Sequence, residues 1–102
     1  MPMKTVSCVT AQQAQAAANH FLNEHLPDRF TAERAQLTAT GDAWQVPIVL
    51  AYPFIGALGQ VGEVLVSTAL EIVVSHTPLS DMKQVGQRLY EARRDEIQAS
   101  FS

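Results

Sequence analysis

This sequence has few of the residues that mark unusual chain classes, with one cysteine, five glycines and five prolines among 102 residues. Cys8 alone cannot form an intramolecular disulfide, so the fold does not depend on an oxidising compartment. No repeat or low-complexity segment divides the chain. The length suits one hydrophobic core, and we expect residues 1–102 to form a single domain.

Positive charge is also scarce. Seven Lys and Arg residues stand against ten Asp and Glu residues, which gives a formal net charge of −3. Proteins that bind nucleic acid rely on clustered Lys and Arg side chains to neutralise phosphates. We therefore expect no nucleic-acid partner.

Long hydrophobic runs are missing as well. The longest, residues 46–58, is broken by Pro47, Pro53 and Gly56, which end a helix well before it spans a bilayer. The first fifteen residues contain no continuous apolar segment of the kind found in a secretory signal peptide. We expect no membrane partner and a cytoplasmic protein.

The chain is nevertheless rich in core-forming side chains, since 47% of its residues are apolar. Over residues 11–26 these side chains recur at helical spacing, which predicts an amphipathic helix. Thr10 is suited to cap this helix, Gln13 can complete a capping box, and Pro27 ends the pattern.

Alternating patterns follow the helix. Residues 32–40 alternate as a half-exposed strand does, and Gly41 and Asp42 predict a tight turn. In the next strand, five large apolar residues share one face: Trp44, Val46, Ile48, Leu50 and Tyr52. Pro47 removes one backbone donor from this strand, which indicates an edge position or a bulge.

The second half predicts a loop, a hairpin and a helix. Prolines and glycines predict a loop over residues 53–59, and strands over 61–67 and 70–75 flank a turn at Thr68 and Ala69. Thr77 as N-cap and Pro78 as first helical residue predict a helix whose apolar positions run to Phe101. The expected order is an N-terminal helix, a three- to four-stranded antiparallel sheet and a C-terminal helix, an α+β fold.

Two segments carry a resemblance to known families. Residues 62–75, GEVLVSTALEIVVS, resemble the end of a PepSY-type repeat, although Ser67 to Glu71 lack the Asp and Gly of that family's hairpin turn. The segment WQVPIVLAYP is similar to a W-x-V-P-I-x-L-x-Y-P string in small uncharacterised bacterial, notably cyanobacterial, proteins. The PepSY resemblance implies a helix before a small antiparallel sheet and a non-catalytic, inhibitory or partner-binding role in an extracytoplasmic setting.

Three groups of residues could carry chemistry. His20, Glu24 and His25 cluster on the first helix, and His76 would have to complete a metal site, without the spacing of known zinc motifs. Ser75 and His76 are adjacent on a strand and therefore point to opposite faces, which argues against a hydrolase. The glycines of residues 56–62 lack a following helix and a Lys-Ser/Thr ending, so they do not predict a phosphate site. We expect no metal, no cofactor and no enzymatic activity.

The best functional indication is apolar character on both faces of the predicted sheet. Val49 and Ala51 lie opposite the Trp44 face, and Val73 lies opposite Leu70, Ile72 and Val74, whereas two helices cover one face. We therefore expect a homodimer that acts by protein contact. The loop residues Phe54, Ile55 and Leu58 either pack into this chain's own core or, as we favour, lie at the interface. The alternative is a small-ligand site or enzyme pocket under the loop, lined by Trp44 and Tyr52.

Overall fold

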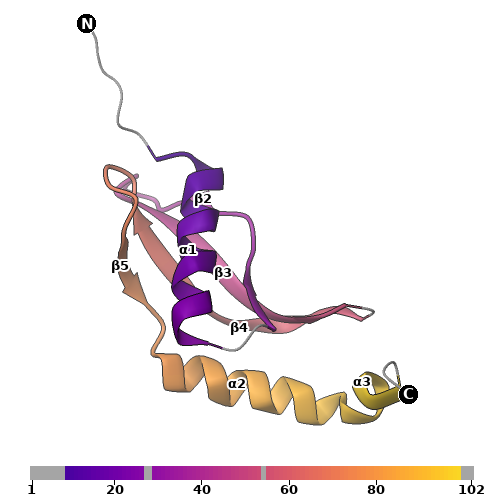
Figure 1. Ribbon diagram of the computed structural model, residues 1–102. Helices are drawn as coiled ribbons and strands as arrows, with labels where there is room; N and C mark the ends of the chain where they lie inside the picture. The colour runs from indigo at the N-terminus through magenta and orange to yellow at the C-terminus, as the bar shows by residue number, and fades with distance from the viewer. Residues whose placement is uncertain (1–8, 27–28, 54, 100–102) are drawn as a thin grey trace, which may run out of the picture.

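The computed structural model describes residues 9–26, 29–53 and 55–99. Their order is helix, sheet, helices, as Figure 1 shows: α1 (Ala11–His25), β1 (Phe30–Ala32), β2 (Gln36–Leu37), β3 (Ala43–Tyr52), β4 (Gly56–Ser67), β5 (Val73–His76), α2 (Leu79–Ala92) and α3 (Arg94–Ala99). All strand pairs are antiparallel. The predicted α+β fold is confirmed.

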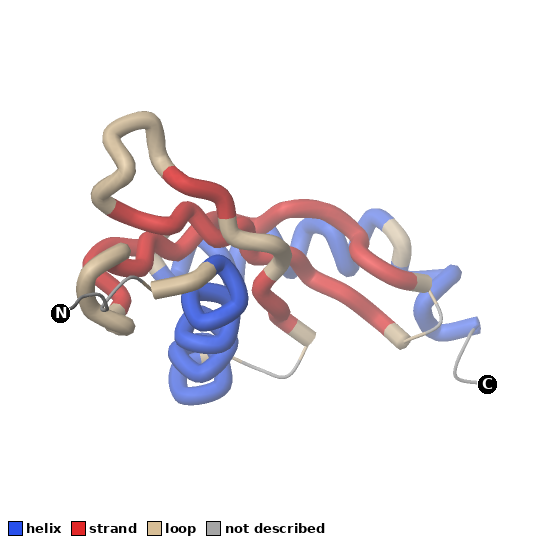
Figure 2. The backbone as a smooth tube through the Cα atoms, turned by 90° about the horizontal axis from the view of Figure 1, so that it is seen from above, coloured by secondary structure: helices blue, strands red, loops and turns tan. Residues whose placement is uncertain are grey.

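The long β3–β4 hairpin forms the centre of the sheet. Its register pairs Val46 with Val64, and it shifts after Ile48 and again after Leu50. Within the described residues, β1 and β2 both pair with the outer side of β3, and β5 pairs with the outer side of β4. Viewed from above, the two hairpin strands run side by side and curve strongly (Figure 2).

The first helix begins as predicted. The Thr10 hydroxyl accepts a hydrogen bond from the Gln13 amide at 3.1 Å, and the Gln13 side chain accepts one from the Thr10 amide at 2.8 Å. This capping box satisfies two donors at a helix end that otherwise lacks partners. One face of α1 then buries Ala14, Ala18 and Leu22 against the sheet.

Pro47 explains why the strand beside β3 is interrupted. Its partner Glu63 directs both backbone groups away from β3, to the Thr77 amide at 2.9 Å and the Thr77 hydroxyl at 3.0 Å. Two directly opposed residues of an antiparallel pair point their backbone N–H and C=O groups either at each other or away from each other. Because Glu63 points its groups away from β3, Pro47 points its own away from β4, and its carbonyl accepts a hydrogen bond from the Glu33 amide at 2.9 Å. The missing donor therefore falls between β1 and β2. β3 itself is not an edge strand, so that half of the prediction was wrong, and the irregularity nearest to Pro47 lies between Ile48 and Val49.

Both connections around β4 differ from the predicted lengths. The loop expected over 53–59 is shorter, because β4 already begins at Gly56, whose φ of +89° follows the turn in which the Ile55 amide donates to the Tyr52 carbonyl. A residue in this left-handed region commonly follows a short hairpin turn. The second connection is longer than two residues, spanning 68–72, and the Thr68 hydroxyl fixes its start by contacting the Gly41 and Asp42 carbonyls.

The last helix starts later and is interrupted. Thr77 does not cap it: the Thr77 hydroxyl instead accepts a hydrogen bond from Glu63 of β4, and Pro78 occupies the cap position without a side-chain bond. The helix breaks at Arg93, between α2 and α3, so the predicted continuous helix is wrong. Phe101 lies outside the described residues.

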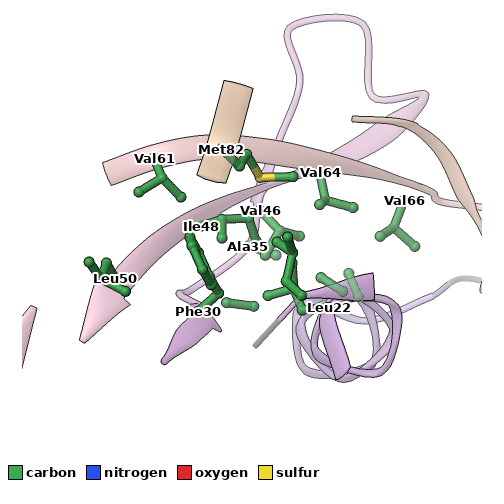
Figure 3. Close-up of a cluster of buried hydrophobic side chains, with 14 of the residues drawn as sticks. Leu22, Phe30, Ala35, Val46, Ile48, Leu50, Val61, Val64, Val66 and Met82 are labelled. Carbon is green, nitrogen blue, oxygen red and sulfur yellow. The ribbon is translucent and has the colours of Figure 1, made fainter. Parts of the chain in front are cut away.

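The core lies on one face of the sheet. Val46, Ile48 and Leu50 point from β3 toward both helices, with Leu22 arriving from α1 and Met82 from α2 (Figure 3). Glycines let α2 approach closely, since a Cβ at Gly59 would lie 3.1 Å from Leu89 and one at Gly86 would lie 2.8 Å from the Phe30 ring.

The opposite face of the sheet is less apolar than the sequence suggested. It carries the exposed Gln45, whose amide donates to the Glu63 carboxylate at 2.6 Å. Val49 lies on this face yet is only 6% exposed, and Ala51 is half-buried. The chain therefore buries Val49 without a second copy, so Val49 does not support a dimer.

Candidate functional sites

The structure separates the two residues that were predicted to line one pocket. Trp44 is half-buried at the start of β3, where its indole Nε1–H donates to the Val9 carbonyl at 2.7 Å and its ring packs against the core. Tyr52 is at the other end of the same strand. Eight residues of extended chain span roughly 26 Å, so the two rings are too far apart to line one pocket.

The three loop residues predicted at an interface also divide. Leu58 is a half-buried residue of β4 that packs against this chain's own core. Ile55 is half-buried in the turn before β4. Phe54 lies outside the described residues. Leu58 is thus a core-packing residue, which corrects the assumption that it lay in a loop.

The histidines do not assemble a metal site. His20 and Glu24 lie one turn apart on α1, 3.7 Å from one another and largely exposed. His76 of β5 instead packs on the Phe21 ring at a centroid distance of 4.8 Å, with His25 on the same ring at 4.6 Å. Nowhere in the described part of the chain do three or more His, Cys, Asp or Glu side chains gather closely enough to hold a metal ion.

The remaining chemical candidates are structural. His76 directs Nδ1 to the Thr77 carbonyl at 2.7 Å. The glycines of residues 56–62 belong to β4, and Gly59 and Gly62 provide space for Leu89 and Met82. These two glycines therefore make room for side chains that pack against β4, most tightly at Gly62.

An exposed apolar patch lies along β5 and the loop before it. We call this surface the β5 patch; it comprises Leu70, Ile72 and Val74, which are 60%, 53% and 54% exposed. Val73 lies opposite these residues, as predicted, and it is Val73 that faces the core. The ladder explains this orientation, because Val66 pairs with Val73 while Leu65 pairs with Ser75, which leaves Val74 as an inserted residue.

A groove adjoins the β5 patch. It runs between α1 and β5, has a volume of about 390 Å³ and is lined by Ala16, Ala17, His20, Phe21, Glu24, Glu71, Ile72 and Val73. Its half-buried lining residues Ala17, Phe21 and Val73 are apolar, and its exposed lining residues include Glu24, Glu71 and His20. Surfaces with an apolar centre and a polar rim are typical of protein interfaces.

A second concave site lies at the other end of the sheet. We call it the tyrosine cleft; it has a volume of about 410 Å³ and is lined by Arg29, Phe30, Leu50, Tyr52, Lys83, Gly86, Gln87, Tyr90 and Glu91. The Arg29 guanidinium lies 5.1 Å from the centre of the Tyr52 ring, and the Tyr52 and Tyr90 rings lie 6.2 Å apart. Sequence reasoning found Tyr52 but none of the α2 residues that face it.

The pKa values of Arg93 and Glu96, an ion pair outside both sites, are shifted from their ordinary values. Arg93 donates two hydrogen bonds to the Glu96 carboxylate, at 3.0 and 2.9 Å. These hydrogen bonds, and secondarily the opposite charge, lower the pKa of Glu96 and raise that of Arg93. The pair lies on the surface where α2 gives way to α3.

Comparison of this chain with protein-family models, with curated proteins and with solved structures found no match. The PepSY resemblance therefore stays a prediction. Within residues 9–26, 29–53 and 55–99, no helix combines the length and apolar content needed to cross a bilayer.

Proposed function

We propose that this domain acts by protein contact without catalysis, and that its partner is a second copy of this chain seated on the β5 patch. The observation that carries the proposal is the exposure of three large apolar side chains within five residues of chain, each more than half exposed. Large contiguous apolar surfaces on folded proteins commonly mark interaction sites.

The two edges of the sheet support the choice of surface. On β1, the Ala32 amide donates to Asn19 of α1 at 2.9 Å, and the Ala32 carbonyl accepts from Gln15 of α1 at 3.1 Å. Side chains of this chain thus occupy the β1 edge. At the other edge of the sheet, beside β5, lie the exposed apolar side chains of Ile72 and Val74.

A second copy fits this surface because protruding and recessed features lie side by side on it. In a two-fold dimer the same patch must complement itself. Here the exposed Ile72 and Leu70 stand next to the groove between α1 and β5, whose floor includes Phe21 and Ala17. One copy's protruding side chains can enter its partner's groove, and the symmetry repeats the contact.

We also propose a cytoplasmic setting for this dimer. A single cysteine in 102 residues offers no intramolecular disulfide that would need an oxidising compartment. The PepSY family's extracytoplasmic setting is the competing expectation. Localisation of a tagged full-length chain in its native host distinguishes the two.

The assembly is tested by light scattering at micromolar concentration, where we expect twice the chain mass of 11.1 kDa. Ile72→Asp places a charge in the apolar contact and should give monomers. Leu37→Asp is the matched control, because Leu37 is 55% exposed on β2 at the far side of the sheet, and this variant should remain dimeric. A monomeric parent, or a dimeric Ile72→Asp variant, would contradict the proposal.

A further inference from the structure

We infer that the tyrosine cleft binds a small molecule with a flat apolar body and a carboxylate group. This site lies at the opposite end of the sheet from the β5 patch and does not depend on the proposed dimer. Its volume of about 410 Å³ falls within the usual range for small-molecule sites.

The floor of the cleft is apolar and firmly packed. Phe30 and Leu50 are paired across β1 and β3 and are almost fully buried. Gly86 of α2 faces them without a side chain, and a Cβ there would lie 2.8 Å from Phe30 Cζ and 3.9 Å from Leu50 Cδ2. The close packing between helix and strand gives a flat ligand a fixed apolar surface to lie on.

Two aromatic rings form one wall. The Tyr52 and Tyr90 rings are 6.2 Å apart and inclined by 37°. A third ring would need contact distances of about 3.5–4.0 Å on each side, so it does not fit between the two tyrosines. The ligand therefore lies against this wall, beside the Tyr90 phenol group, which can donate a hydrogen bond to it.

The charges at the mouth favour an anion. Two positive side chains line the cleft, Arg29 just before β1 and Lys83 on α2. Lys83 has no ion pair with any residue that the structure describes. The acidic lining residue, Glu91, is engaged by Arg94 at 3.0 Å. Lys83 is therefore the cation that we expect to bind the carboxylate directly, and Arg29, held over the Tyr52 ring, adds positive potential beside it.

The test uses 2-naphthoate as the probe and 2-naphthalenemethanol as its uncharged counterpart, titrated into the full-length chain and followed by amide chemical shifts in NMR spectra. We expect saturable shifts at amides of Phe30, Tyr52 and Gln87 with the acid, and affinity about tenfold weaker for the alcohol, which is the loss expected when one charge-assisted contact is removed. Equal affinity for the two compounds would overturn the proposal.

Variants assign the effect to the cleft. Arg29→Gln combined with Lys83→Gln should weaken naphthoate binding about tenfold and leave the alcohol unchanged. Arg88→Gln is the matched control, since Arg88 is an exposed cation of α2 that does not line the cleft, and it should bind as the parent does. Equal losses in the control, or shifts confined to residues outside the cleft, would overturn the proposal.

One further titration separates this inference from the proposed dimer. The Ile72→Asp variant changes only the distant β5 patch and should bind naphthoate with the parent's affinity. Loss of binding in that variant would overturn the inference that the cleft is complete within one chain. Dispersed amide spectra of every variant establish that each one is folded.

Discussion

Gly62 of β4 lies directly against Met82 of α2, so closely that a Cβ atom on Gly62 would come within 2.8 Å of Met82 Cγ. The same position would lie 2.9 Å from Cβ of Thr77, which is held in place by two hydrogen bonds to Glu63. The absence of a side chain at residue 62 therefore sets the distance at which α2 docks on the sheet.

Replacing this glycine should destabilise the domain. We expect Gly62→Ala to lower the free energy of unfolding by about 1–3 kcal/mol, as overpacking usually does. Gly59→Ala is the matched control on the same strand, because its Cβ would meet only the flexible end of Leu89, at 3.1 Å. Urea unfolding measures both variants, and an equal loss in the two would contradict the docking role of Gly62.

Trp44 should contribute through packing and through one hydrogen bond. Trp44→Ala should cost about 3 kcal/mol, the lower end for a large aromatic, because the ring is half-buried. Trp44→Phe keeps much of the ring but leaves the Val9 carbonyl without its indole donor, at a cost of about 1 kcal/mol. Thermal melts that match the parent for both variants would show that Trp44 is a surface residue.

The side-chain cover of the β1 edge can be removed at one residue. Asn19→Ala leaves the Ala32 amide without a partner, and we expect a loss of about 1–3 kcal/mol in unfolding free energy. Asn23→Ala is the matched control, since Asn23 is exposed on the same helix and should stay within about 0.5 kcal/mol. Similar denaturant midpoints for the two variants would refute the structural role of Asn19.

The end of α2 should respond to acid. The pKa of Glu96 is lowered by its hydrogen bonds from Arg93, so the pair's stabilisation is complete above the ordinary carboxyl pKa of 4.5 and is lost as the pH falls through the lower folded-state pKa. Amide shifts of residues 94–98 should therefore change at acidic pH. Glu96→Gln should abolish that change, and an unaltered titration in the variant would exclude the Arg93 pair as its cause.

The sequence predicts the helical and strand segments where a local pattern determines them. Thr10 and Gln13 formed the expected capping box, and alternation identified the buried face of β3. For the strand after residue 70, alternation shows which residues share a face of the sheet but not which face is buried. The inserted Val74 puts Val73, and not Val74, opposite the buried Val66. A bulge is set by pairing with a neighbouring strand, which the local pattern does not contain.

The candidate sites were less predictable than the fold. Tyr52 was identified, but Arg29 reaches it only through the pairing of β1 with β3, and Tyr90 only after α2 packs on the sheet. Two features of the sequence do bear on this site. Gly86 interrupts an otherwise amphipathic helix between Lys83 and Tyr90, which indicates close approach, and the spacing of Trp44 and Tyr52 along one strand excludes a shared pocket.

The β3–β4 hairpin has a consequence for the order of folding. Its two strands are separated by three residues, so its contacts close small loops and carry little entropic cost. The helices α1 and α2 pack on the apolar face of this hairpin. That face forms only when β3 and β4 are paired in register, with Val46 opposite Val64, so we expect the helices to dock after the hairpin has formed. We therefore expect the hairpin to form the folding nucleus, with the glycine-lined docking of α2 among the last steps.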